Sequence, residues 1–107
     1  MSVRDLKIKA GVVKRLAKEL VSYEKEAVAQ RSRIDKLISA GADEHDVNKQ
    51  KEVLEETSQM IPDNKRRLGA AYKELETIVA ELVAADPKLE ETEEVVAAKT
   101  LLDEVTV

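Results

Sequence analysis

The sequence predicts an all-α fold: an elongated antiparallel three-helix bundle with a bent middle helix and a shorter third helix. Three observations lead to this prediction. Only three glycines and two prolines interrupt the 107 residues, so long helices are expected. Apolar residues recur every seven positions along two long segments. Phenylalanine, tryptophan and cysteine are absent, so Ala, Val, Leu and Ile must fill thin seams between helices.

The first helix is expected over about residues 3–40. Ser2, with Asp5 three residues later, has the pattern of a capping box at its start. Gly41 suits the left-handed residue that ends a helix, and Asp43 suits the cap of the next one. The short loop between them predicts an antiparallel hairpin. The heptad seam of this helix comprises Leu6, Val13, Leu16, Leu20, Tyr23, Ala27, Ile34 and Leu37, together with the polar Lys9 and Gln30.

The second helix, over about residues 44–84, contains Pro62. Proline removes a backbone donor and costs a helix interior about 3 kcal/mol. The heptad nevertheless passes from Ile61 to Leu68 without losing phase, which favours one bent helix with Pro62 on its outer side. The alternative is two helices, with Pro62 as the first residue of the second. The repeat itself comprises Val47, Leu54, Ile61, Leu68, Leu75 and Leu82.

The third helix is expected over about residues 87–105, because Asp86 and Pro87 form a cap followed by a proline in the first helical position. It is shorter than the other two and would cover only one end of their hairpin. Polar residues occupy the seam where it does not reach, namely Gln30, Gln50, Thr57 and Asn64. All three helices are expected to form a single domain over residues 1–107.

Composition and charge exclude several classes of function. The net charge is −4, with a basic first segment (+5 over residues 1–40) and an acidic last one (−5 over residues 83–107). This pattern favours attraction between helices over nucleic-acid binding. Residues 2–9 are rich in charge, so no secretory signal is expected, and no apolar run reaches the roughly 20 residues that span a membrane. A cytoplasmic protein without membrane contact is expected.

No enzyme site or metal site is predicted, and no cofactor. His45 lies at a helix start beside Asp43, Glu44 and Asp46, where a solvated helix end is the more ordinary interpretation than a metal site. The chain has no cysteine and no second histidine, and a thin bundle offers little pocket for a catalytic carboxylate.

Function is therefore expected on the outer surface. Val21, Val28 and Ile8 lie off the seam, where they either pack against the third helix, are scattered exposed apolar residues, or belong to a partner surface. Pro62, Tyr23 and Tyr72 are predicted to be structural. The predicted partner-binding residues are charged and lie on the first two helices: Lys14, Arg15, Lys18, Glu24, Lys25, Asp63, Arg66 and Arg67.

Two segments resemble the tubulin-folding cofactor A family: IKAGVVKRLAKELVSYEKEA (8–27) and KQKEVLEETSQMIPDNKRRLGAAYKELE (49–76). The tetrapeptide MIPD, followed by RRL and AAY, is the most specific part. Gly69 departs from the family pattern, in which a charged helix former precedes AAY. The resemblance covers most of the chain and fades after about Asp86.

The resemblance implies a three-helix bundle with a bent middle helix. It also implies a cytoplasmic, cytoskeleton-associated chaperone that binds β-tubulin monomer on the way to the α/β heterodimer without a nucleotide, with other tubulin-folding cofactors as further partners. Tubulin is acidic, so the basic first helix is the expected contact. The alternative is a structural coiled coil that forms a homodimer or serves as an adaptor.

Overall fold

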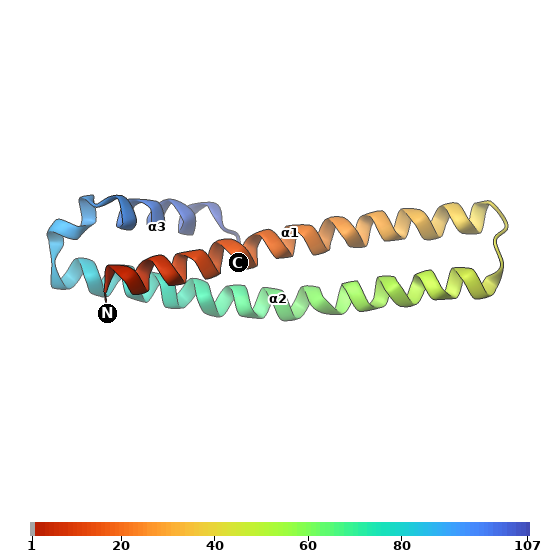
Figure 1. The fold of residues 1–107 in the computed structure, drawn as a ribbon, viewed down its shortest axis with the longest axis horizontal. Helices are drawn as coiled ribbons and strands as arrows, with labels where there is room; N and C mark the ends of the chain where they lie inside the picture. The colour runs from red at the N-terminus through yellow and green to blue at the C-terminus, as the bar shows by residue number, and fades with distance from the viewer. Residues whose placement is uncertain (1) are drawn as a thin grey trace. The chain divides into compact units, whose positions relative to one another are not determined.

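The computed structural model describes residues 2–107 and contains α-helices and one short 3-10 helix, with no strand among these residues. The α-helices are α1 (Val3–Ser39), α2 (Glu44–Ala85) and α3 (Glu93–Glu104) (Figure 1). The all-α prediction with a shorter third helix is thereby confirmed. Contacts group the chain into two compact units. The three-helix unit holds the residues up to Lys18 and Lys65–Val107, and the hairpin unit holds Glu19–Asn64.

Local chemistry explains the ends of α1. The Asp5 amide donates to Ser2 Oγ (3.2 Å) and the Ser2 amide donates back to Asp5 Oδ2 (2.9 Å), which confirms the capping box. Gly41 ends the helix with a φ of 73°. The Gly41 amide donates to the Ile38 carbonyl and the Ala42 amide to the Leu37 carbonyl, the two bonds of a Schellman motif.

Pro62 does not divide α2. The helix is continuous from Glu44 to Ala85, so the prediction of one helix is confirmed and the alternative of two helices is wrong. Pro62 is exposed, as its place one residue after the seam position Ile61 predicts. Its ring can therefore sit on the solvent side of the helix, where the loss of one backbone donor is tolerated.

The prediction of one α-helix over about 87–105 is wrong in its first part. Residues Pro87–Glu91 form the 3-10 helix η1, and α3 begins only after Thr92. Asp86 does cap η1, since its Oδ1 accepts from the Lys88 amide at 3.2 Å. Thr92 then ends η1 and caps α3, because its hydroxyl accepts from the Val95 amide (3.5 Å). A second capping residue thus competes with continuation of the first helix.

The three-helix unit has the larger apolar core. Its fully buried side chains include Leu6, Val13, Leu68, Leu75 and Val95, from all three α-helices. The core of the hairpin unit is thinner: its buried apolar residues are Ala27, Ile34 and Val47, and Gln30 and Asn64 are buried with them. The prediction of polar residues in the two-helix part of the seam is confirmed.

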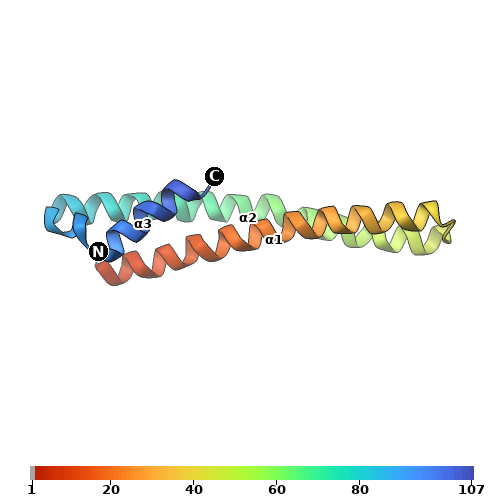
Figure 2. The same cartoon turned by 90° about the horizontal axis from the view of Figure 1, so that it is seen from above.

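Tyr72 ties α3 to α2 within the three-helix unit, where α3 runs beside the C-terminal part of α2 (Figure 2). The Tyr72 hydroxyl donates to the Leu102 carbonyl at 2.8 Å. This carbonyl belongs to the last turn of α3, where carbonyls lack partners within the helix.

The substitution Tyr72→Phe is expected to lower the free energy of unfolding by about 1 kcal/mol, because it removes this hydrogen bond and leaves the ring in place. Urea denaturation measures the change. Tyr23→Phe is the matched control, since Tyr23 is also half-buried and its hydroxyl has no hydrogen bond within residues 2–107. Equal effects of the two substitutions would contradict a role for the Tyr72 bond.

Candidate functional site

The predicted basic contact on α1 consists of exposed side chains. Lys14 and Lys18 are four residues apart and Arg15 and Lys18 three apart, so the three lie on one side of the helix within the three-helix unit. Arg15 already takes part in an interaction within the chain. Lys14 and Lys18 are therefore the cations of this set to test first as contacts for an acidic partner.

The other predicted binding residues are divided between the two units. Arg66 and Arg67 belong to the three-helix unit, and Glu24, Lys25 and Asp63 belong to the hairpin unit. All are exposed except Asp63, which is half-buried. Arg66, Arg67 and Asp63 each have an interaction within the chain.

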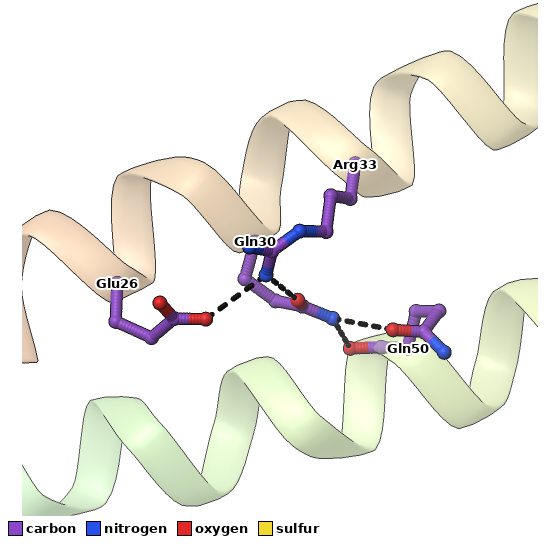
Figure 3. Close-up of polar contacts among 4 residues, drawn as sticks. All are labelled: Glu26, Gln30, Arg33 and Gln50. Carbon is purple, nitrogen blue, oxygen red and sulfur yellow. Dashed lines mark hydrogen bonds and ion pairs between the residues drawn. The ribbon is translucent and has the colours of Figure 1, made fainter.

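A polar cluster crosses the seam of the hairpin unit (Figure 3). Gln30, only 2% exposed, donates through Nε2 to the Gln50 carbonyl (2.9 Å) and to Gln50 Oε1 (2.8 Å). Arg33 Nη1 donates to Gln30 Oε1 (2.8 Å) and to Glu26 Oε1 (2.9 Å). Both polar atoms of the buried amide thus have partners, which removes most of the cost of burying it.

The substitution Gln30→Ala is expected to lower the free energy of unfolding by about 1–3 kcal/mol, through a lost hydrogen-bond network and a cavity. Gln30→Leu, which keeps the volume, is expected to stay within about 1 kcal/mol of wild type, because the half-buried Gln50 and the exposed Arg33 can bind water instead. Guanidinium denaturation measures both. A leucine as costly as the alanine would contradict this explanation.

Asn64 is a second buried polar residue of the hairpin seam. Its Nδ2 donates to Glu19 Oε2 at 3.3 Å, while its Oδ1 is buried and has no hydrogen-bond partner among residues 2–107. A buried acceptor without a hydrogen bond costs about 1–3 kcal/mol. The seam two residues after Pro62 is therefore held less firmly than the core of the three-helix unit.

Several exposed apolar side chains belong to the hairpin unit. Val21 is 52% exposed and Val28 63%, so of the three alternatives for these residues, packing against the third helix is wrong. Ile38, Val53 and Met60 are also exposed. Two helices cannot enclose side chains that point away from their common seam, which is the physical reason for this exposure.

A groove of about 610 Å³ runs between α1 and α3 in the three-helix unit. Small side chains of α1 (Ala10, Gly11) and of α3 (Ala97) line it, with lysines of α1 and glutamates of α3 beside them. No groove is among the features predicted from the sequence. An exposed glycine inside a helix was the signal that could have found it, because that glycine costs about 1 kcal/mol relative to alanine.

His45 lies in the first turn of α2, beside acidic residues. His45 is exposed, and no group of three or more His, Cys, Asp or Glu side chains among residues 2–107 has the arrangement of a metal site.

Two exposed carboxyl groups have a lowered pKa, and ordinary surface interactions cause both shifts. The Ser2 backbone amide lowers the pKa of Asp5, and the Lys99 ammonium lowers the pKa of Glu90. Over residues 2–107, no helix has the length and apolar character needed to cross a membrane.

Comparison with known proteins identifies the family. The family model described as tubulin binding cofactor A matches residues 1–102. The chain belongs to the tubulin binding cofactor A family. Within this family it is similar to the human "Tubulin-specific chaperone A", with 48% identity over 103 residues, 96% of this chain and 92% of the human protein.

Solved structures of the cofactor A family agree. A structure described as human tubulin chaperone cofactor A is 46% identical and has a TM-score of 0.77, with 94% of each chain covered. The structure of tubulin folding cofactor A from Arabidopsis thaliana is 38% identical and has a TM-score of 0.80, covering 95% of this chain and 92% of the other. The similarity extends through most of α3, so the expectation that it fades after Asp86 is wrong.

Proposed function

We propose that this protein is a tubulin-folding chaperone that binds β-tubulin monomer and holds it until the α/β heterodimer is assembled, in the cytoplasm and without nucleotide hydrolysis. The observation that supports the proposal is membership of the cofactor A family over residues 1–102, with relatives named as tubulin chaperones. Other tubulin-folding cofactors are proposed as the proteins that receive the monomer.

The surface chemistry is suited to holding and release. A binder that covers part of a monomer lowers the concentration of free monomer by mass action. It must also release its cargo, so a charged surface that accelerates encounter is more useful than a large apolar interface. Lys14 and Lys18 offer exposed positive charge on α1 for an acidic partner, and Arg66 and Arg67 offer it on α2.

The decisive experiment is size-exclusion chromatography of the protein mixed with β-tubulin released from the cytosolic chaperonin. We expect a stoichiometric complex at micromolar concentration that forms without added nucleotide. α-Tubulin prepared in the same way is the control for specificity. Absence of co-elution with β-tubulin would contradict the proposal, and equal co-elution with α-tubulin would contradict its specificity.

The variant Lys14→Glu/Lys18→Glu tests the basic contact on α1. It is expected to weaken the complex about tenfold while circular dichroism stays helical, since both side chains are exposed. The matched control is Lys49→Glu/Lys51→Glu, which makes the same charge change at exposed positions of α2. Equal binding by the two variants would mean that only net charge matters and that α1 has no special role.

Self-association is the second candidate function. The exposed Val21, Val28, Val53 and Met60 of the hairpin unit favour it, because a second copy could cover them. Analytical ultracentrifugation of the protein alone separates the two candidates. A stable homodimer that does not bind β-tubulin would replace the chaperone proposal.

A further inference from the structure

The groove between α1 and α3 has a floor of small residues. Ala10 and Gly11 of α1 face Ala97 and Ala98 of α3, with Leu101 beside them. Gly11 and Ala97 are exposed. A Cβ added at Gly11 would meet no atom within 4 Å, so the space above the α1 backbone is open there. Helix geometry does not require this glycine, whose conformation any residue can adopt and whose absence of a side chain costs helix stability.

The two edges of the groove carry opposite charge. Lys7 and Lys14 lie on the α1 edge, seven residues apart and so on one side of the helix. The α3 edge carries Glu93, Glu94 and Glu104. The sequence favoured direct attraction between the basic first segment and the acidic last one. Among the ion pairs of residues 2–107, however, none joins these lysines to these glutamates.

Other charged residues of the same unit do form ion pairs. Lys9 pairs with Glu74 between α1 and α2, and Lys99 pairs with Glu90 at 2.8 Å. In this unit, ion pairs therefore join α1 to α2 and α3 to η1. The lysines and glutamates on the two edges of the groove do not pair with each other. A groove with a small-residue floor and two edges of opposite sign is complementary to an amphipathic helix with one acidic side and one basic side.

We propose that this groove docks an amphipathic helix of the tubulin partner, an inference that rests on the proposed function. The apolar ridge of the partner helix enters over Gly11, its acidic side faces Lys7 and Lys14, and its basic side faces Glu93 and Glu104. The contact thus lies on the three-helix unit and involves α3 as well as α1. Lys7, Gly11, Glu93 and Glu104 are thereby added to the predicted partner-binding residues.

A partner helix fits the groove better than a second copy of this chain. On a second copy, the exposed valines of the hairpin unit are among the apolar side chains that could enter the groove. Their insertion into the groove of another molecule would join two different surfaces. Such heterologous contacts produce rings or open chains of molecules rather than a closed pair. Such chains of this protein would not be suited to a chaperone that binds and releases one tubulin monomer at a time.

The test fills the groove without harming the fold. Gly11→Leu places a side chain in open, exposed space and improves helix propensity. We expect its thermal midpoint to rise by about 4–8 °C, while its affinity for β-tubulin falls about tenfold or more. Gly69→Ala is the matched control, because an added Cβ there also meets no atom within 4 Å and Gly69 does not line the groove. It should raise the midpoint similarly and leave binding unchanged.

A charge reversal on α3 tests whether the acidic edge of the groove contacts β-tubulin. Glu104→Lys is expected to weaken β-tubulin binding several-fold, and Asp103→Lys, the same change at the adjacent exposed residue outside the groove, is expected to leave it unchanged. Near the C-terminus of a helix a lysine is tolerated or favourable, so either variant should fold.

The outcomes separate this inference from the proposed function. If wild type fails to bind β-tubulin, the proposed function fails and the inference fails with it. If wild type binds and Gly11→Leu binds equally well, the groove inference alone is overturned. If wild type self-associates in ultracentrifugation and Gly11→Leu abolishes only that association, the occupant is a second copy and the inference is also overturned.

Discussion

Shortening Leu75 to alanine is expected to lower the free energy of unfolding by about 3–5 kcal/mol, the largest loss we expect from any single substitution in this protein. Leu75 is 0% exposed and lies on α2 in the three-helix unit. The loss combines the transfer free energy of the removed methyl groups with the cost of the cavity that they leave. The unit has little room to collapse around the cavity, because its buried apolar residues also include Leu6, Val13 and Val95 from the other two helices.

Guanidinium denaturation followed by circular dichroism measures the effect of Leu75→Ala. Leu54→Ala is the matched control: Leu54 occupies the same heptad position of α2 in the hairpin unit but is only half-buried, so about 1–2 kcal/mol is expected. If Leu75→Ala does not fold, Leu75→Val replaces it, with an expected loss of about 1 kcal/mol. A loss at Leu75 no larger than that at Leu54 would contradict a tightly packed three-helix core.

The substitution Pro62→Ala is expected to raise the free energy of unfolding by about 2 kcal/mol. Alanine restores the backbone donor that a continuous helix directs to the Ser58 carbonyl, and proline in a helix interior costs about 3 kcal/mol relative to alanine. Part of that gain is lost, because proline also restricts the unfolded chain, by about 0.4–1 kcal/mol. Pro62 is exposed, so its replacement removes little packing.

The same denaturation experiment measures Pro62→Ala, with Met60→Ala as its control. Met60 is exposed on the same helix two residues earlier, and its substitution should change the stability by less than about 0.5 kcal/mol. An unchanged or lower stability of Pro62→Ala would mean that the surrounding helix has adapted to the proline. A more stable variant that binds β-tubulin less well would assign Pro62 a part in presenting the binding surface.

The helices themselves could be predicted because their determinants are local. The Ser2–Asp5 capping box and the positive φ of Gly41 depend on residues only a few positions apart, so α1 ends within one residue of its predicted bounds. The unbroken heptad across Pro62 predicted one α2, and the structure has one. The error lies at η1, where Asp86 with Pro87 and then Thr92 each cap a helix start. The predicted helix over 87–105 rests on the first cap alone, and the Thr92 cap divides it.

The candidate site was less predictable than the fold. Exposed charge on Lys14 and Lys18 follows from their place off the seam, and the buried polar residues follow from the length of the third helix. Which buried amide would find partners was not predictable. Gln30 has two partner residues that satisfy both of its polar atoms, whereas Asn64 Oδ1 has no partner in the part of the chain that the structure describes. That difference depends on side-chain rotamers and on distances between helices, and neither can be deduced from heptad spacing.

By itself, the sequence determined the helical class, the ends of α1, the continuity of α2 and the family, because caps, heptads and motifs act through residues close together in the chain. Only the tertiary structure decided that α3 leaves a groove beside α1, with Lys7 and Lys14 on one edge and glutamates on the other. Residues 7–14 are separated from residues 93–104 by at least 79 positions (93 − 14). Their relation follows from how η1 and the Tyr72–Leu102 hydrogen bond place α3 on α2, which no local pattern specifies.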